Sequence, residues 1–208
     1  GVYRGGERGS VAGTAGYEAL ILGDMNLLID GNNLAWAGFH ALRKAMEAES
    51  EEQKTRAALL GLTQSVLNLA IRGGEPPVAG RPQEAAASLA GNPVRALSVA
   101  FDEGRPLRRR TVYPNYQLGR ESNPSFVENE PAVLAAIDQF IELAGLLPVT
   151  LARGVNTEAD DLIACLALGT EGPVRIASTD RDFLQLVDER LTIYSPVKRV
   201  VIGVAEFA

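Results

Sequence analysis

The sequence predicts an α/β domain in which buried parallel strands alternate with amphipathic helices. Two short apolar runs each lead into an acid: Met25–Asp30, and Arg95–Phe101 followed by Asp102. Continuous apolar runs of this length are typical of strands that are buried on both faces. Gln53–Ile71 instead carries apolar residues at spacings of three and four, which is typical of a helix. The 208 residues, 46% of them hydrophobic, suit one domain of ordinary size.

The first half of the chain contains two segments without a regular period. Residues 1–24 are rich in glycine, and we expect either a flexible leader or an artificial extension, with the folded domain at 25–208. After the first strand, Gly31–Asn33 is a turn signal, and a helix is expected from about Leu34 to Ala48. Residues 72–93 are rich in Gly, Pro and Ala, which favours a long surface loop.

The second half continues the alternation of helices and strands. In chain order we expect a helix from about Pro131 to Gly145, a strand at Leu146–Leu151, a helix that begins at Glu158 after a Thr157 cap, a strand at Val174–Ala177, a short helix at Phe183–Val187, and edge strands at Leu191–Ser195 and Val197–Val201.

Composition narrows the class of protein. No apolar run approaches the ~20 residues of a membrane helix, and residues 1–24 show no secretory pattern. The single cysteine, Cys165, excludes an internal disulfide and stands in an apolar run, so we expect it in the core. We therefore expect a cytoplasmic protein that does not interact with membranes.

Seven acids carry the functional hypothesis. Five of them lie within Gly154–Asp182, and two more follow the apolar runs: Glu158, Asp160, Asp161, Asp180, Asp182, Asp30 and Asp102. Because ligands of open α/β sheets bind at the carboxyl ends of the strands, we expect these acids to converge on divalent metal ions. A helix cap with dipole-stabilising carboxylates explains one or two of them, but not three acids within four residues. All candidate ligands are oxygens, which Mg²⁺ and Mn²⁺ prefer.

The charge distribution points to a phosphate-containing substrate. The net charge of −6 alone argues against a nucleic-acid binder. However, the stretch between Glu103 and Glu121 holds five arginines and no acid: Arg105, Arg108, Arg109, Arg110 and Arg120. A basic segment beside a carboxylate cluster suits a phosphodiester, although a solvated arginine-rich loop is the alternative.

Five segments match a known pattern: LLIDGNNL at 27–34, VAFDEGRPLRR at 99–109, VYPNYQLGR at 112–120, GVNTEADDLIACLA at 154–167 and IASTDRDFLQLVDERLTIYSP at 176–196. Together they resemble the metal-binding core of the 5′-3′ exonuclease and flap endonuclease family. That family includes the exonuclease domain of bacterial DNA polymerase I and its stand-alone bacterial and phage relatives. The resemblance runs from Met25 to the C-terminus, except for the loop at 72–93.

The resemblance implies a PIN-like (resolvase-like) fold of three layers, with a central, twisted, mostly parallel sheet and helices on both faces. It implies a structure-specific DNA nuclease that hydrolyses phosphodiester bonds by two-metal-ion catalysis with Mg²⁺ or Mn²⁺. The substrate would be DNA with a 5′ single-stranded flap or end. The first ion would be held by Asp30, Asp102, Glu158 and Asp160, and the second by Asp161, Asp180 and Asp182.

The resemblance also implies catalytic roles outside the acids. The segment from Arg105 to Phe126 corresponds to the region that leads into the family's helical arch. Tyr116 matches a tyrosine that can stack on a base, and Arg120 matches an arginine that faces the scissile phosphate. Arg108 or Arg109 matches the arginine position that follows the second strand's acid.

Two departures from the family keep alternatives open. Gln117 stands where the family usually has a lysine inside the site. The family also continues into a helix–hairpin–helix region that grips the duplex, and this chain ends before it. We expect a partner or a C-terminal region of a longer protein to supply that grip. The alternatives are a PIN-type ribonuclease and a catalytically weak module that binds branched DNA.

Overall fold

The computed structural model describes residues 24–74, 94–104, 106–117, 119 and 122–207, without the side chains of Leu107, Arg108 and Phe207. Its elements are β1 (Met25–Asp30), α1 (Gly31–Leu42), α2 (Glu51–Arg72), β2 (Val94–Glu103), α3 (Leu107–Val112), α5 (Pro124–Ala144), β3 (Thr150–Val155), α6 (Ala159–Gly169), β4 (Val174–Ala177), the 3₁₀ helix η4 (Asp182–Leu186), β5 (Leu191–Ser195), β6 (Val200–Ile202) and the 3₁₀ helix η5 (Val204–Phe207).

The described strands form one sheet in the order β3-β2-β1-β4-β5-β6. All neighbouring pairs are parallel except β5 and β6, which are antiparallel at one edge. The first strand of the chain is therefore an interior strand, with β2 on one side and β4 on the other. This arrangement confirms the expected sheet and its closing edge strand.

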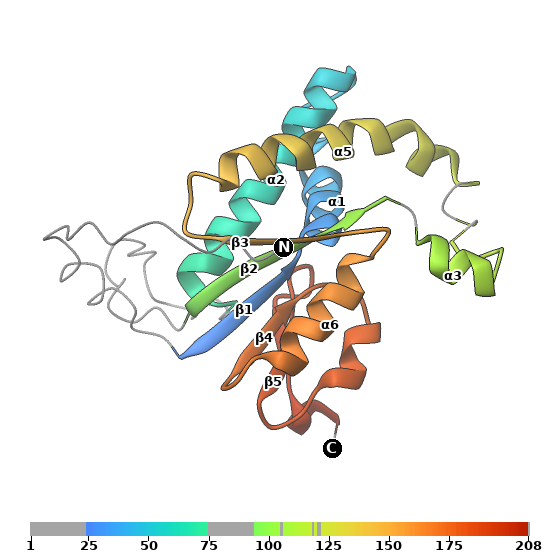
Figure 1. The fold of residues 1–208 in the computed structure, drawn as a ribbon. Coiled ribbons are helices and arrows are strands. Elements are labelled where there is room, and N and C mark those ends of the chain that lie inside the picture. The colour runs from blue at the N-terminus through green and yellow to red at the C-terminus, as the bar shows by residue number, and fades with distance from the viewer. Residues whose placement is uncertain (1–23, 75–93, 105, 118, 120–121, 208) are drawn as a thin grey trace, which may run out of the picture.

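Helices cover both faces of the sheet, so the fold has three layers (Figure 1). The helices α1, α2 and α5 lie over one face, and α6 lies over the other. Alternating strand residues feed the two cores: Leu27 and Ile29 of β1 pack toward α1 and α2, whereas Leu28 packs toward α6. The interior strands are thus buried on both faces, which explains their continuous apolar sequence.

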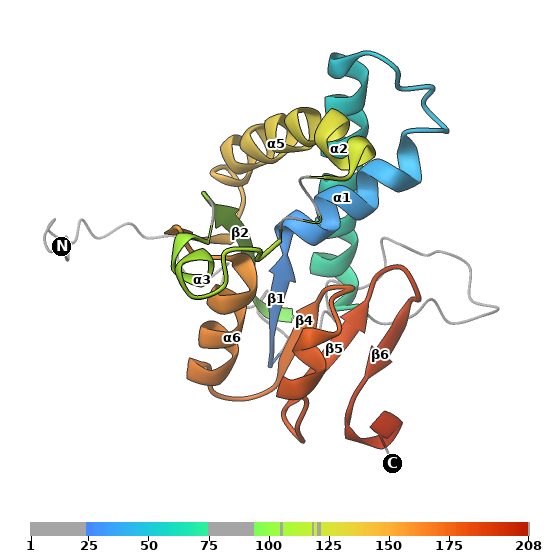
Figure 2. The ribbon, with the colours of Figure 1, turned by 90° about the vertical axis from the view of Figure 1, so that its right-hand side faces the viewer.

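Several predicted boundaries were wrong. Helix α1 begins at Gly31, because Asp30 is its N-cap and accepts the backbone N–H of Asn33 at 2.9 Å. Helix α5 begins at Pro124 rather than Pro131, and β3 begins at Thr150. In α6 the N-cap is Glu158 rather than Thr157. Figure 2 shows β6 at the sheet edge, and this strand is shorter than expected.

Two further expectations concern surfaces. Cys165 is exposed on α6 and is not a core residue, because the core face of that helix is formed by Ala159, Ile163 and Ala167. Within the described ranges, no helix has the length and apolar character needed to cross a membrane. Most of the predicted loop at 72–93 and the segment 1–23 lie outside the described residues.

A close backbone contact joins α1 and α2. A Cβ atom built on Gly61 would stand 2.5 Å from the Cα of Gly38, and a Cβ on Gly38 would stand 2.7 Å from the Cα of Gly61. Real Cβ atoms do not approach backbone this closely, so the two helices would have to separate. The two glycines therefore fix the position of α1, which follows Asp30 directly.

We predict that Gly61→Ala destabilises the fold by about 1–3 kcal/mol, the usual cost of overpacking a closed interface. The control is Gly169→Ala, since a Cβ at Gly169 meets nothing within 4 Å. Urea unfolding followed by circular dichroism measures both free energies of unfolding. Equal stabilities of the two variants would contradict the close contact.

Candidate active site

The carboxyl ends of the interior strands bring two acids and a serine together. The register pairs Asp30 of β1 with Ala100 of β2, and Ile29 with Ala177 of β4. The residue after β4, Ser178, therefore lies beside Asp30, and its hydroxyl donates to Asp30 Oδ2 at 2.9 Å. Asp102 lies at the end of β2, two residues beyond the position paired with Asp30.

Asp102 also connects the sheet to α6. Its Oδ1 accepts the backbone N–H of Ala159 at 2.7 Å, so it satisfies one of the free amide groups in the first turn of that helix. Glu158, the N-cap residue, makes no side-chain cap hydrogen bond. Its carboxylate instead lines the cleft, and the acid that caps the helix comes from another element.

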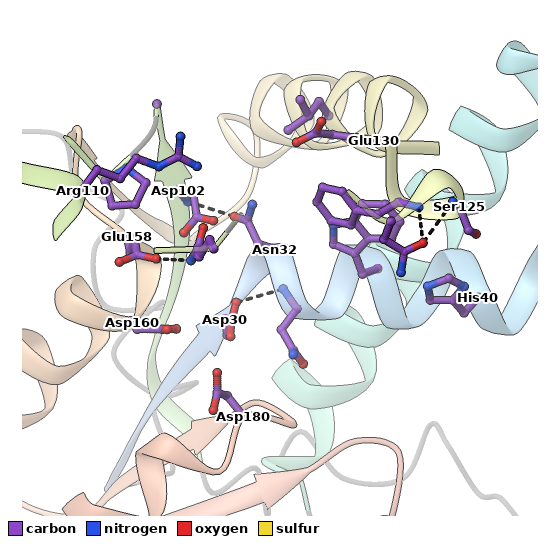
Figure 3. A pocket seen from close by; sticks show the side chains of 18 residues that line it. Asp30, Asn32, His40, Asp102, Arg110, Ser125, Glu130, Glu158, Asp160 and Asp180 are labelled. Carbon is purple, nitrogen blue, oxygen red and sulfur yellow. Dashed lines mark hydrogen bonds between the residues drawn. The ribbon is translucent and has the colours of Figure 1, made fainter. Parts of the chain in front are cut away.

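Five of the seven predicted acids line one cleft of about 640 Å³: Asp30, Asp102, Glu158, Asp160 and Asp180. Figure 3 shows these side chains gathered at one end of the cleft, while His40 and Ser125 mark the other end. The acids come from β1, β2, α6, its N-cap and the loop after β4. The predicted convergence of distant acids at one sheet edge is therefore present in the structure.

The remaining two acids lie at a smaller neighbouring pocket. Asp161 and Asp182 line a hollow of about 130 Å³, together with Asp160 and Arg109. Asp160 is therefore common to both hollows. Asp180, which the resemblance groups with Asp161 and Asp182, lines the larger cleft instead.

The electrostatics of the larger cleft disfavour ionised carboxylates. Burial raises the pKa of Asp30 to about 7, and the charges of Asp160 and Asp102 add to the rise. Burial also raises the pKa of Asp160 to about 6, with Asp180, Asp102 and Glu158 contributing repulsion. In the cleft, burial and the neighbouring acids therefore disfavour the charged forms of Asp30 and Asp160.

Side chains of the segment that follows β2 pair with some of the acids. Arg109 forms ion pairs with Glu158 and Asp161, each with an N–O distance of 2.6 Å. Gln117 donates from Nε2 to Glu158 Oε1 at 2.6 Å, and Tyr116 donates its hydroxyl to the same carboxylate at 3.3 Å. Three of the five predicted catalytic residues therefore contact the acidic cluster.

The other two predicted catalytic residues fall on the undescribed part of the chain. The side chain of Arg108 and the whole of Arg120 lie outside the described residues. Their predicted roles therefore stay predictions.

Sequence reasoning missed a set of polar residues that hold the acids in place. Asn32 Oδ1 accepts the backbone N–H of Asp102 at 2.9 Å. Asn33 donates to the hydroxyl of Thr179 at 2.7 Å and accepts the backbone N–H of Thr179 at 3.0 Å. Ser178 accepts the backbone N–H of Asp180 at 3.1 Å. The signal for these contacts in the sequence is the pair Asn32-Asn33, which follows the strand-end acid after one glycine.

An aromatic wall at the far end of the cleft was also missed. Trp36 of α1 stacks on Phe126 of α5, with ring centroids 4.7 Å apart and an angle of 19° between the planes. His40, in the same helix, also stacks on Trp36, with ring centroids 5.7 Å apart. All three residues line the cleft. An extended ligand would therefore meet acids at one end and flat apolar rings at the other.

The residues of the cleft fit divalent cations. The candidate ligands are carboxylate oxygens, which Mg²⁺ and similar cations prefer. Burial and mutual repulsion raise the pKa of Asp30 and Asp160, so a bound cation would favour their charged forms. In the arrangement described by the structure, no three Asp, Glu, His or Cys side chains are close enough to hold one ion between them. For three of these carboxylates to hold one ion, their side chains would therefore have to move closer together.

Comparison with known proteins identifies a matching family and similar chains. The family model described as the 5′-3′ exonuclease, N-terminal resolvase-like domain matches residues 25–208. DNA polymerase I of Mycobacterium tuberculosis is 33% identical over 177 residues, which cover 84% of this chain and 17% of that protein. The thermostable DNA polymerase I of Thermus aquaticus is 30% identical over 173 residues, which cover 82% of this chain and 17% of that protein. The chain thus spans about a sixth of the length of these relatives.

Solved structures share the fold. A phage T5 5′-exonuclease with bound zinc ions matches with a TM-score of 0.57 and 16% identity, over 86% of this chain and 58% of that one. A bacteriophage T5 flap endonuclease in a pseudo-enzyme-product complex with DNA and metal ions matches with a TM-score of 0.56 and 14% identity, over 86% of this chain and 57% of that one. These similarities confirm the PIN-like fold. With the match over residues 25–208, the chain belongs to the family of 5′-3′ exonuclease N-terminal, resolvase-like domains.

Proposed function

We propose that this chain is the catalytic domain of a divalent-metal-dependent, structure-specific DNA nuclease of the 5′-3′ exonuclease and flap endonuclease type. The observation that carries the proposal is the cleft into which four separate parts of the fold deliver five carboxylates. It lies beside a segment that bears arginines. Together these features suit a phosphodiester held next to cations.

We propose that the cations are two ions of Mg²⁺ or Mn²⁺. Asp30, Asp102, Glu158 and Asp160 would hold the first, and Asp161, Asp180 and Asp182 the second. Relatives with the same fold were solved with metal ions, zinc among them, and one of them with DNA. When bound, two such ions neutralise the charge that develops on the attacking and leaving oxygens of an in-line displacement at phosphorus.

The chain's own residues would bind and orient the substrate. Arg109 and Tyr116 already lie at the edge of the acidic cluster, where they can reach a phosphate and a base. We propose the same phosphate-binding role for Arg108 and Arg120. Gln117 brings a hydrogen-bond donor without a charge, so it would orient a phosphate oxygen rather than neutralise it.

The substrate we propose is DNA with a 5′ single-stranded flap or end, in the cytoplasm. The matched polymerases extend far beyond the part that this chain resembles. We therefore propose that a further region or a partner protein grips the duplex, and that the domain alone binds duplex DNA weakly.

Cleavage of a flap substrate tests this function. We predict that the wild-type protein with Mg²⁺ or Mn²⁺ cleaves DNA with a labelled 5′ flap. Asp180→Ala should lower the rate by roughly a hundredfold, because a lost ion ligand removes about 2.7 kcal/mol of charge stabilisation. Asp138→Ala is the matched control, since Asp138 is exposed on α5 and lies outside the cleft.

Equal trace activity in the wild type and Asp180→Ala would overturn the proposal. Competing single-stranded RNA of the same sequence separates the two nuclease types, because preferential RNA cleavage would identify a PIN-type ribonuclease instead. Binding of branched DNA without metal-dependent cleavage would identify a binding module.

A further inference from the structure

One cation of the chain itself already occupies part of the acidic cluster. Arg109 of α3 places Nη1 2.6 Å from Glu158 Oε2 and Nη2 2.6 Å from Asp161 Oδ1. Its guanidinium therefore bridges two carboxylates. Glu158 lines the larger cleft, and Asp161 lines the smaller pocket. The Glu158 side chain is 8% exposed, so water offers this carboxylate little competing solvation.

The neighbours of Arg109 hold it in this position. Arg109 Nη1 donates to the hydroxyl of Tyr116 at 2.5 Å, and the guanidinium lies over the Tyr116 ring, 5.3 Å from its centroid. Gln117 donates to the second oxygen of Glu158. Its backbone φ is +61°, a value that residues other than glycine rarely adopt. Both oxygens of Glu158 are thus bonded to residues of one segment.

The position of Arg109 conflicts with a bound ion. Arg109 lines the 130 Å³ pocket together with Asp160, Asp161 and Asp182. A divalent ion placed among these acids would meet a positive guanidinium that is already paired with one of them, Asp161. Two like charges this close together repel strongly in a partly buried site.

We propose that Arg109 and a divalent ion exclude each other at Glu158 and Asp161, so that ion binding releases the segment from α3 to Gln117 from the acidic cluster. This competition rests on the proposed metal site, and it implies that ion binding must break the contacts of Arg109 with both carboxylates. In the ion-free protein the arginine neutralises the two carboxylates. Once displaced, it stays within reach of the cleft mouth, with its charge available to a phosphate.

An alternative arrangement makes the opposite prediction. If Arg109 supported the ligands from outside while the ion was bound, its loss would weaken ion binding, as the loss of outer hydrogen-bonding partners does in metal sites. The sign of the change in ion affinity therefore decides between competition and support.

Titration calorimetry with Mn²⁺ alone, in the absence of DNA, measures that sign. We expect Arg109→Gln to bind Mn²⁺ at least about tenfold more tightly than the wild type, since the competing cation is gone. The control is Arg181→Gln, which removes the same charge from an exposed position between Asp180 and Asp182. It should change the affinity by less than about threefold, because it reports only the general field of a nearby charge.

Tyr116→Phe provides a second, milder test. It removes the hydroxyl that accepts from Arg109 and donates to Glu158, so we expect a smaller increase in affinity in the same direction. Hydrogen–deuterium exchange of the peptide 107–117 gives an independent readout. Mn²⁺ should accelerate exchange there in the wild type and leave it unchanged in Arg109→Gln.

Unchanged or weaker Mn²⁺ binding by Arg109→Gln would overturn the competition while leaving the metal site intact. So would equal effects of Arg109→Gln and Arg181→Gln. Absence of Mn²⁺ binding in every variant, the wild type included, would instead overturn the proposed metal site, and the competition with it.

Discussion

Replacing Asp30 by asparagine should make the ion-free protein more stable and, at the same time, abolish metal-dependent cleavage. Asp30 is 5% exposed, and burial raises its pKa to about 7. The charged form is therefore unfavourable in the folded state at pH 8. Asparagine keeps the carbonyl oxygen that accepts the backbone N–H of Asn33, and it is a good helix N-cap.

The expected gain at pH 8 is roughly 2 kcal/mol, about half of what the pKa shift gives at ~1.4 kcal/mol per unit. The other half is lost because Ser178 no longer donates to a carboxylate. The dependence of folding stability on pH has a definite sign. An acid with a raised folded-state pKa lowers stability as the pH rises from about 4 to about 7, and the effect is constant above that range. The asparagine variant should lack this slope.

Urea unfolding between pH 4 and pH 9, without divalent ions, measures the gain and the slope. Cleavage of the 5′ flap substrate by the same samples with Mg²⁺ should fall by at least about a hundredfold, because a proposed ion ligand is lost. Asp138→Asn, an exposed replacement on α5, should change neither quantity. A variant that is less stable at pH 8, or that cleaves at the wild-type rate, would contradict the assignment.

Two replacements of Asp102 should separate its role as a helix cap from its proposed role in cleavage. Its Oδ1 caps α6 through the N–H of Ala159, and its charge faces the cleft. Asp102→Asn keeps the accepting oxygen but loses the charge, whereas Asp102→Ala loses both. We expect both variants to lose at least about a hundredfold in cleavage rate. Only the alanine variant should lose about 1 kcal/mol of stability, the usual value of a helix cap.

Flap cleavage and urea unfolding of the two variants, measured side by side, test this separation. If asparagine destabilised the fold as much as alanine, the cap would not depend on the oxygen of residue 102. If either variant cleaved normally, Asp102 would have no part in the chemistry.

The buried strands could be predicted because their sequence pattern is local. The apolar runs predict β1, β4 and β5 at the bounds that the structure shows, since these strands are covered on both faces. Helix α5 was harder. The sequence contains two start signals for this helix. The Asn123 cap with Pro124 in the first turn is the true one, whereas Pro131, the predicted start, lies in the helix interior.

Half of the candidate site could be predicted for the same reason. An acid at the end of a parallel strand is placed by topology, so the sequence predicts that Asp30 and Asp102 lie near each other at one edge of the sheet. The partners of these acids could not be found in this way. The contact between Arg109 and Asp161, or between Asn33 and Thr179, joins residues far apart in sequence and depends on side-chain positions.

The interior position of β1 has a consequence for how the protein reaches its working state. Asp30 meets Ser178 only after β1 has paired with β4, across about 150 residues of intervening chain. Contacts between such distant positions form late in folding, because a long loop must close first. The cleft should therefore be among the last parts of the domain to form. Nascent or partly folded chains would hold the same acids without their arrangement, so we expect the proposed nuclease activity only from chains whose fold is complete.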